Sequence, residues 1–233
     1  MSGPDHDGER SPSRGAGAGM SLATLLVVAD GRLPAGGHAH SGGLEAQVAA
    51  GRVRDVAGLA GFLRGRLATT GLVSAAFAAA ACRRTDEWVD LDLGLDARTP
   101  SPALRKASRA QGRALVRAGR AMWPMPAIGR EPHQPIALGV LAAAAGLGPV
   151  EAAVAAAHGT VTGPASAAVR LLGLDPYEVH GLLARLAPEC DRIAADAAAR
   201  AGDPVDLLPA AGAPLLDIGA ELHATWEVRL FAS

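Results

Sequence analysis

The sequence "SPALRKASRAQGRALVRAGRAM", residues 101–122, gives the clearest indication of the fold. Its apolar and small residues recur at intervals of four, three, four, three and four, which places them on one face of an α-helix. These positions are Leu104, Ser108, Gln111, Leu115, Ala118 and Met122. Ser101 is a suitable N-cap, and Pro102 suits the first helical position. We therefore predict a helix over 101–122 whose inward polar residues, Ser108 and Gln111, need hydrogen-bond partners if they are buried.

The composition of the whole chain favours the same kind of structure. Of the 233 residues, 49% are hydrophobic but only 3% are aromatic, and alanine is abundant. Alanine is the best helix former and lets helices approach closely, whereas β-branched and aromatic residues favour strands. We expect an all-α fold: a single-domain helical bundle of about nine to ten helices over residues 21–233. Residues 1–20 are rich in Gly, Ser, Pro and charge, and predict a disordered tail.

Apolar periodicity, caps and breaker residues predict the other helices. Asp55 is a plausible N-cap, Gly71 separates two apolar helices, and Gly163–Pro164 interrupts a third. A loop with two prolines leaves room for only a short helical turn within residues 86–100. The remaining expected helices cover residues 22–30, 43–50, 55–69, 71–84, 136–146, 149–172, 176–201 and 215–229.

Charge and cysteine content exclude several classes of protein. A net charge of −1 and a pI near 6.7 do not indicate a nucleic-acid binder. Cys82 and Cys190 cannot form a disulfide scaffold or a zinc site. No secretion signal is recognisable, and Pro149 and Glu151 interrupt the long apolar run after residue 136. We expect a cytoplasmic protein that binds neither membrane nor nucleic acid.

The glycine-rich stretch "ADGRLPAGGHAHSGGLEA", residues 29–46, could be a phosphate loop, a metal loop or a turn before a helix. Gly31 and Gly36 have the spacing of a P-loop, but Gly37 and His38 stand where that loop needs Lys and Ser/Thr. Two neighbouring histidines could bind one ion, yet a stable site needs three or four ligands. A phosphate loop is therefore excluded, and a metal loop is weakly supported.

Hydrolytic catalysis by the same stretch is also poorly supported. His40 and Ser41 are adjacent in sequence, so their side chains diverge, and no nucleophile-elbow pattern surrounds them. Ser41 more simply accepts backbone hydrogen bonds at the start of the next helix, and Glu45 suits its first turn. We assign no catalytic, cofactor-binding or metal-binding residue.

Two further features can each be interpreted in two ways. The helix over 101–122 carries Arg or Lys at six positions between Arg105 and Arg120 and no acidic residue. These charges could bind an acidic protein face or nucleic acid, or could pair with acidic neighbours within the fold. The chain ends in "RLFAS", where Leu230 and Phe231 must pack on the protein's own core or on a partner.

Four segments in register resemble the urease accessory protein F (UreF) family. The first is the glycine-rich stretch, with the family pattern Asp, Leu-Pro-x-Gly-Gly, His-Ser-x-Gly-Leu-Glu; the others are "RKASRAQGRALV", "PHQPIALGVLAAAAGL" and "RLFAS". The resemblance covers residue 22 to the last residue. The chain departs from the family pattern at His38, where an aromatic residue is usual, and at Leu174 or Asp175, where a glutamine is expected. A divergent paralogue that acts as a scaffold for other partners therefore stays an alternative.

The resemblance implies a maturation chaperone rather than an enzyme. Such proteins are all-helical, dimerise, bind the D/H-type urease accessory protein, recruit the G-type accessory GTPase, and help to insert nickel into apo-urease. Regulation of the GTPase by the family has been proposed by analogy, but the sequence singles out no arginine for it. The tail of the family is an interface with the D/H-type partner, which becomes ordered on binding. The candidate interface residues are His40, Ser41, Glu45, Arg229, Leu230, Phe231 and Ser233. A direct nickel carrier that uses His38 and His40 is a further alternative.

Overall fold

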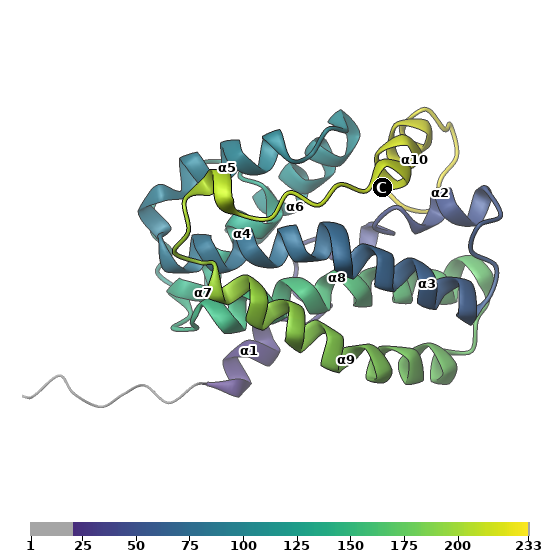
Figure 1. Cartoon of the computed structure of the whole chain (residues 1–233), viewed down its shortest axis with the longest axis horizontal. Helices are drawn as coiled ribbons and strands as arrows, with labels where there is room; N and C mark the ends of the chain where they lie inside the picture. Colours follow the sequence, from purple (N-terminus) through teal and green to yellow (C-terminus); the bar gives the residue numbers. More distant parts are fainter. Residues whose placement is uncertain (1–20, 233) are drawn as a thin grey trace, which may run out of the picture.

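The computed structural model describes residues 21–232, so the predicted tail, residues 1–20, and Ser233 lie outside the described residues. This part of the chain contains α-helices and short 3-10 turns but no strand, which confirms the all-α prediction. Figure 1 shows the helices packed as a bundle, with α10 and the C-terminal end near α2. The helices are α1 Leu22–Val28, α2 Leu44–Ala49, α3 Val56–Arg66, α4 Leu72–Arg83, α5 Trp88–Ala97, α6 Pro102–Met122, α7 Gln134–Ala144, α8 Pro149–Leu172, α9 Pro176–Ala199 and α10 Pro214–Ala224.

The predicted break at Gly71 is wrong, because α3 and α4 form one continuous helix over Val56–Arg83. A wider π turn, Leu67–Gly71, joins them without interrupting the helix. The described chain therefore has nine separate helices. This helix is long and apolar enough to span a membrane, but its most apolar part is 61% buried among the other helices, as expected of the central helix of a bundle.

Helix α4 lies at the centre of the bundle and contacts α7, α8 and α9. Phe77 is completely buried, and the neighbouring core positions of α4 are mostly alanine. The small side chains bring backbones together: a Cβ added to Gly139 on α7 would lie 2.2 Å from the carbonyl oxygen of Ala78 on α4. Close helix packing thus explains why the core needs so few aromatic residues.

The predicted interruption of α8 near Pro164 is also wrong, since the helix continues from Pro149 to Leu172. Proline has no N–H, so the carbonyl four residues earlier, that of Thr160, loses its usual partner. Arg66 replaces this partner, because its Nε donates to the Thr160 oxygen at 3.3 Å. A side chain from α3 therefore satisfies the backbone at the proline.

Two helix boundaries differ from the prediction. Residues 88–97 form the full helix α5 rather than a short turn. Helix α10 ends at Ala224, five residues before the predicted end. Beyond this end, the amides of Leu230 and Phe231 bond to the side chain of Glu45.

The predicted caps are confirmed. The hydroxyl of Ser101 accepts a hydrogen bond from the amide of Leu104 at 3.1 Å, and the Asp55 carboxylate accepts one from Gly58 at 2.8 Å. On the predicted inward face of α6, Leu115 is buried, whereas Met122 is 41% exposed. The buried face of α6 therefore ends one turn before the helix does.

Candidate partner-binding site

The glycine-rich stretch forms the turn between α1 and α2, as predicted. Gly36, Gly42 and Gly43 have positive φ angles, a conformation that glycine adopts without steric cost. Arg66 holds this turn against the bundle, because the same guanidinium that bonds Thr160 also donates to the Gly42 carbonyl. Burial lowers the pKa of Arg66 to about 10. The turn is thereby fixed relative to α3 and α8.

Ser41 fixes the start of α2, although Gly43 rather than Ser41 is the N-cap residue. The Ser41 side chain is completely buried, and its hydroxyl accepts a hydrogen bond from the amide of Glu45 at 3.2 Å. Glu45 lies in the first turn of α2, as predicted. Its carboxylate, however, has a second function that the helix pattern does not indicate.

The carboxylate of Glu45 holds the C-terminal tail. Its Oε2 accepts hydrogen bonds from His223 Nε2 at 2.8 Å and from the Phe231 amide at 3.1 Å, and its Oε1 accepts one from the Leu230 amide at 2.8 Å. The amide of Ala232 then donates to the Ala39 carbonyl at 2.7 Å. We call Glu45, His223 and residues 228–232 the tail clamp. It joins parts of the chain that are almost 190 residues apart.

The tail presents one apolar side chain inward and others outward. Phe231 is 4% exposed and packs under the Arg170 guanidinium, 4.7 Å from the ring centroid. Val228 and Leu230 are 87% and 63% exposed. The two alternatives for the chain end therefore apply to different residues: Phe231 packs on the protein's own core, and Leu230 stays accessible. That the tail becomes ordered on binding a partner stays a prediction.

The other candidate interface residues lie around the clamp or in it. His40 is half-buried beside Ser41, and burial, followed by the nearby His38, lowers its pKa. Arg229 is exposed in the tail, and Ser233 lies outside the described residues. His38 is exposed. Within residues 21–232, no group of three or more His, Cys, Asp or Glu residues is arranged to hold a metal ion.

A cavity of about 800 Å³ lies next to the clamp. Phe231 forms part of its wall, together with Arg66, Arg170, His158 and His180. Apolar residues such as Val28, Leu183 and Leu216 line it as well. Because Phe231 belongs to the tail, release of the tail would widen the cavity.

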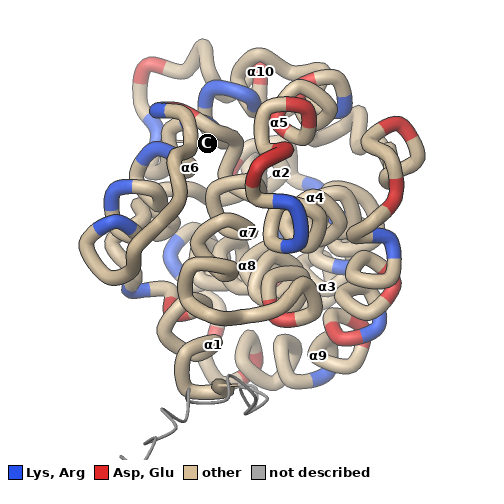
Figure 2. The backbone as a smooth tube through the Cα atoms, turned by 90° about the vertical axis from the view of Figure 1, so that its left-hand side faces the viewer, with Lys and Arg blue, Asp and Glu red and all other residues tan. Residues whose placement is uncertain are grey.

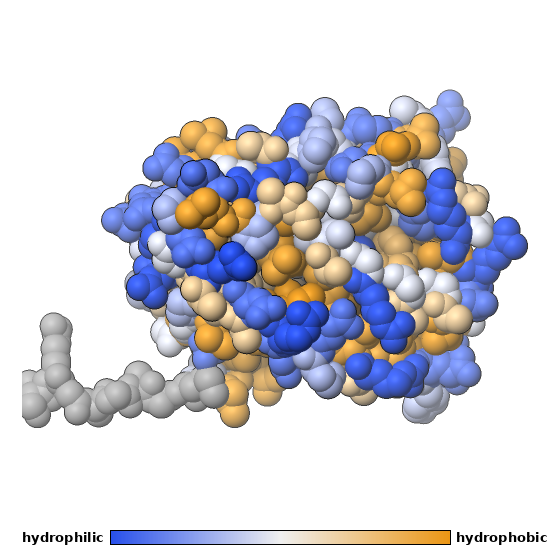
Figure 3. Space-filling model, viewed as in Figure 1, coloured by the Kyte–Doolittle hydropathy of each residue, from blue (hydrophilic) through white to orange (hydrophobic). Residues whose placement is uncertain are grey.

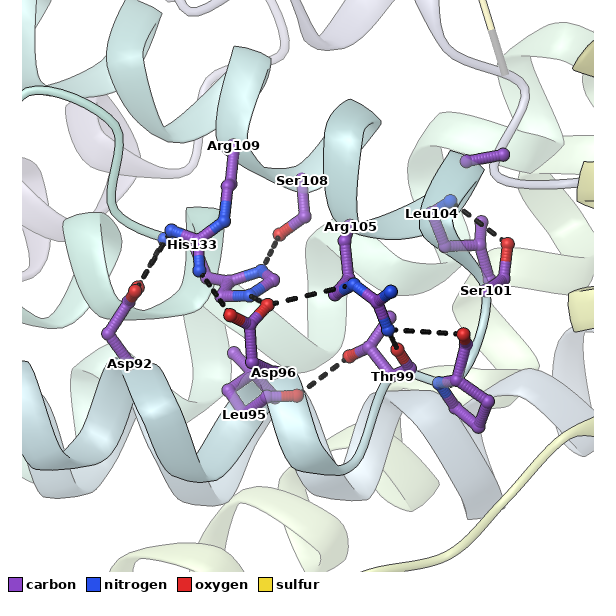
Figure 4. A network of polar contacts seen from close by, with 12 residues as sticks. Asp92, Leu95, Asp96, Thr99, Ser101, Leu104, Arg105, Ser108, Arg109 and His133 are labelled. Carbon is purple, nitrogen blue, oxygen red and sulfur yellow. Dashed lines mark hydrogen bonds and ion pairs between the residues drawn. The ribbon is translucent and has the colours of Figure 1, made fainter.

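A second polar cluster surrounds His133, which is completely buried (Figure 4). The His133 amide donates to Asp92 at 2.7 Å, and its ring Nε2 lies 2.8 Å from an Asp96 oxygen. Its Nδ1 lies 3.0 Å from the Ser108 hydroxyl, so Ser108 has the partner that its inward position requires. Arg109 bridges both carboxylates, at 2.9 Å from Asp92 and 2.8 Å from Asp96. We call these five residues the His133 network.

The His133 network joins α5, α6 and the start of α7. Burial lowers the pKa of His133, so the ring is held neutral and donates from Nε2. Burial by itself would raise the pKa of Asp96, but hydrogen bonds from His133 and Arg109 lower it overall. The sequence identified Ser108 but not the two α5 carboxylates, Asp92 and Asp96, that bond His133 and Arg109, because no local pattern distinguishes them from surface acids.

Polar contacts attach helix α10 to α6 and α2, and the sequence did not predict them. Glu221 accepts hydrogen bonds from the Ser101 hydroxyl and, at 2.9 Å, from the Ala103 amide at the start of α6. Gln47 donates from Nε2 to the Leu215 carbonyl at 3.3 Å. These contacts place His223 against Glu45, and so position the tail clamp.

Comparisons with known proteins identify relatives of this chain by sequence. The family model described as UreF matches residues 53–187. The chain is 48% identical over 216 residues to the urease accessory protein UreF of Mycobacterium sp. (strain JLS), and 47% identical over 219 residues to that of Mycolicibacterium vanbaalenii; each match covers 91% of this chain and 99% of the relative. The protein of the same name from Mycobacterium tuberculosis (strain H37Rv) is 44% identical over 216 residues.

The family model includes the helices that carry the His133 network, and the matches to the relatives extend well beyond the four short segments, over 91% of the chain. The family consists of accessory proteins rather than catalytic enzymes, and its membership implies a role in urease maturation. A family model that matches more than half of the chain, together with identities of 44–48% to named members, shows that the chain belongs to the UreF family of urease accessory proteins.

Proposed function

We propose that the protein is a cytoplasmic urease maturation chaperone that acts through protein–protein contacts. It binds the D/H-type urease accessory protein, recruits the G-type accessory GTPase, and supports nickel insertion into apo-urease. It acts as a homodimer within this complex. Family membership supports the general role, and the resemblance of the four segments supports these particular partners.

The tail clamp is the observation that best supports the contact with the D/H-type partner. Glu45 fixes the backbone of Leu230 and Phe231, while Val228 and Leu230 expose large apolar side chains. An apolar anchor on a pre-ordered backbone binds at a lower entropic cost than a flexible one. Figure 3 shows a further apolar surface over α10, where Leu215, Ile218 and Leu222 are exposed. This surface adjoins the tail along the chain and can extend the contact.

The test is co-purification with the D/H-type protein of the same organism. The double variant Val228→Asp/Leu230→Asp should reduce capture at least tenfold, because it places charge in an apolar contact but leaves Glu45 and Phe231 unchanged. Leu93→Asp on α5 is the control, since Leu93 is 61% exposed and Leu230 is 63% exposed. Equal capture of both variants would exclude the tail contact. Deleting residues 219–233 is a poorer test, because it removes the buried half of α10.

The alternative, a direct nickel carrier, depends on His38 and His40. One of these residues is exposed and the other half-buried, so two imidazoles at most are offered by this turn. Calorimetry with Ni²⁺ on the purified protein and on His38→Ala/His40→Ala separates the two functions. Equal, weak binding by both proteins is expected; a clear loss of affinity in the double variant would instead support the carrier.

A further inference from the structure

Helix α6 divides its basic residues between two uses. Arg109 faces α5 within the His133 network, and Arg105 bonds the carbonyls of Thr99 and Pro100. The remaining basic residues face outward, and Arg130 in the following loop is exposed as well. We call this outward set the basic ridge; it consists of Lys106, Arg113, Arg117, Arg120 and Arg130.

The fold makes little use of the basic ridge. Arg113 pairs with Glu131, but both side chains are more than half exposed, so the pair contributes little stability. Arg120 donates to the Ile128 carbonyl at 3.2 Å. Lys106, Arg117 and Arg130 have no carboxylate within 4 Å anywhere in residues 21–232.

Like charges along the ridge disfavour the helix that carries them. Arg113 and Arg117 are four residues apart, and Arg117 and Arg120 are three apart; such like-charge pairs destabilise a helix. Helix α9 is built differently, because it mixes Arg185 and Arg192 with several acidic residues. Figure 2 shows blue segments gathered on the side of the molecule where α6 runs. Positive charges that gather on one side of the molecule and destabilise the helix that carries them indicate that these residues bind something outside the fold.

We propose that the basic ridge is a second docking surface, which binds an acidic face of a protein partner. Lys106 and Arg120 are separated by about 21 Å along the axis, at 1.5 Å per residue, which matches an acidic helix or strand. Alanines at 103, 110, 114 and 121 alternate with the basic residues and keep the face flat. Arginine, the main ridge residue, binds carboxylates bidentately.

A protein fits this ridge better than a nucleic acid does. The net charge of the chain is −1, so the field beyond the ridge is weak. Aromatic residues are 3% of the chain, too few for a base-stacking platform. The exposed apolar side chains of the tail and the basic ridge differ in chemistry, so they suit two different partners. The choice of partners below rests on the proposed function.

The test compares two triple variants of the full chain. The ridge variant is Lys106→Glu/Arg113→Glu/Arg117→Glu. The control is Arg64→Glu/Arg185→Glu/Arg200→Glu, which changes exposed arginines on α3, on α9 and at the C-cap of α9 by the same charge. Binding of each variant to the purified D/H-type protein, G-type GTPase and apo-urease is measured by interferometry, with circular dichroism as a check of folding. Duplex DNA and light scattering of the chain alone are included.

The ridge variant should keep the affinity of the wild type for the D/H-type protein and lose at least tenfold for one of the other two proteins. The wild-type affinity for that protein should fall at least tenfold between 50 and 300 mM NaCl, a measurement that needs no variant. The inference is overturned if both triple variants bind every protein equally, or if only DNA binding or self-association changes. If the ridge variant loses binding as expected but Val228→Asp/Leu230→Asp still binds the D/H-type protein as the wild type does, only the proposed tail contact is overturned. A wild-type chain that binds none of the three proteins would overturn both proposals.

Discussion

Replacing Glu45 with glutamine should release the C-terminal tail without unfolding the bundle. Glu45 is 7% exposed, and its carboxylate accepts three hydrogen bonds. Glutamine has nearly the same shape but only one acceptor oxygen. If that oxygen serves His223 and Phe231, the NH₂ group faces the Leu230 amide, and two donors then oppose each other. Leaving a buried donor unpaired costs about 1–3 kcal/mol.

Hydrogen exchange measures this cost directly. A local loss of about 2 kcal/mol corresponds to roughly 30-fold faster exchange, since 1.4 kcal/mol is a factor of ten. We therefore expect the amides of Leu230 and Phe231 to exchange roughly 30-fold faster in Glu45→Gln. Amides of α4, around Phe77, should keep their protection, because α4 packs mainly on α7, α8 and α9.

Glu227→Gln is the matched control, because Glu227 is exposed and lies in the same part of the chain. It should leave exchange at Leu230 and Phe231 unchanged. If Glu45→Gln also leaves both amides as protected as in the wild type, Glu45 does not hold the tail. The proposal that Glu45 orders the tail before a partner binds would then be refuted. Equal loss of protection throughout α4 would show that Glu45 supports the whole bundle instead.

Two further predictions concern stability. Burial lowers the pKa of His133 below its ordinary value of 6.5, so just below pH 6.5 the unfolded chain binds more protons at this residue than the folded chain does. The free energy of unfolding should therefore fall as the pH drops through 6.5. An NMR titration of the His133 ring should show a midpoint below 6.5. A midpoint at or above 6.5 would contradict the described environment of the ring. Gly139→Ala should cost about 3 kcal/mol or more in urea unfolding, because the new Cβ meets the Ala78 carbonyl at 2.2 Å. Gly159→Ala on α8 is the control, where nothing lies within 4 Å of the added Cβ, and it should stabilise by up to about 1 kcal/mol; equal effects of the two substitutions would refute the close packing.

Local patterns predicted most of the helices, and the errors have physical causes. Gly71 and Pro164 are helix breakers in isolation, but packing around Gly71 and the Arg66 bond to Thr160 keep both helices intact. In both cases, a tertiary contact outweighs a local preference of about 1–3 kcal/mol. The predicted end of α10 was five residues too late, and the tail that follows bonds to Glu45, 185 residues earlier in the chain.

The sequence by itself determined the helical class, the caps at Ser101 and Asp55, and the family, because periodicity, capping and motif order depend on neighbours along the chain. Only the tertiary structure decided which polar residues meet. Glu45 and His223 are 178 positions apart, and the split of the α6 arginines depends on where α5 lies. No one-dimensional pattern encodes these distances, because they result from how the helices pack. The tail clamp and the basic ridge are therefore properties of the folded chain.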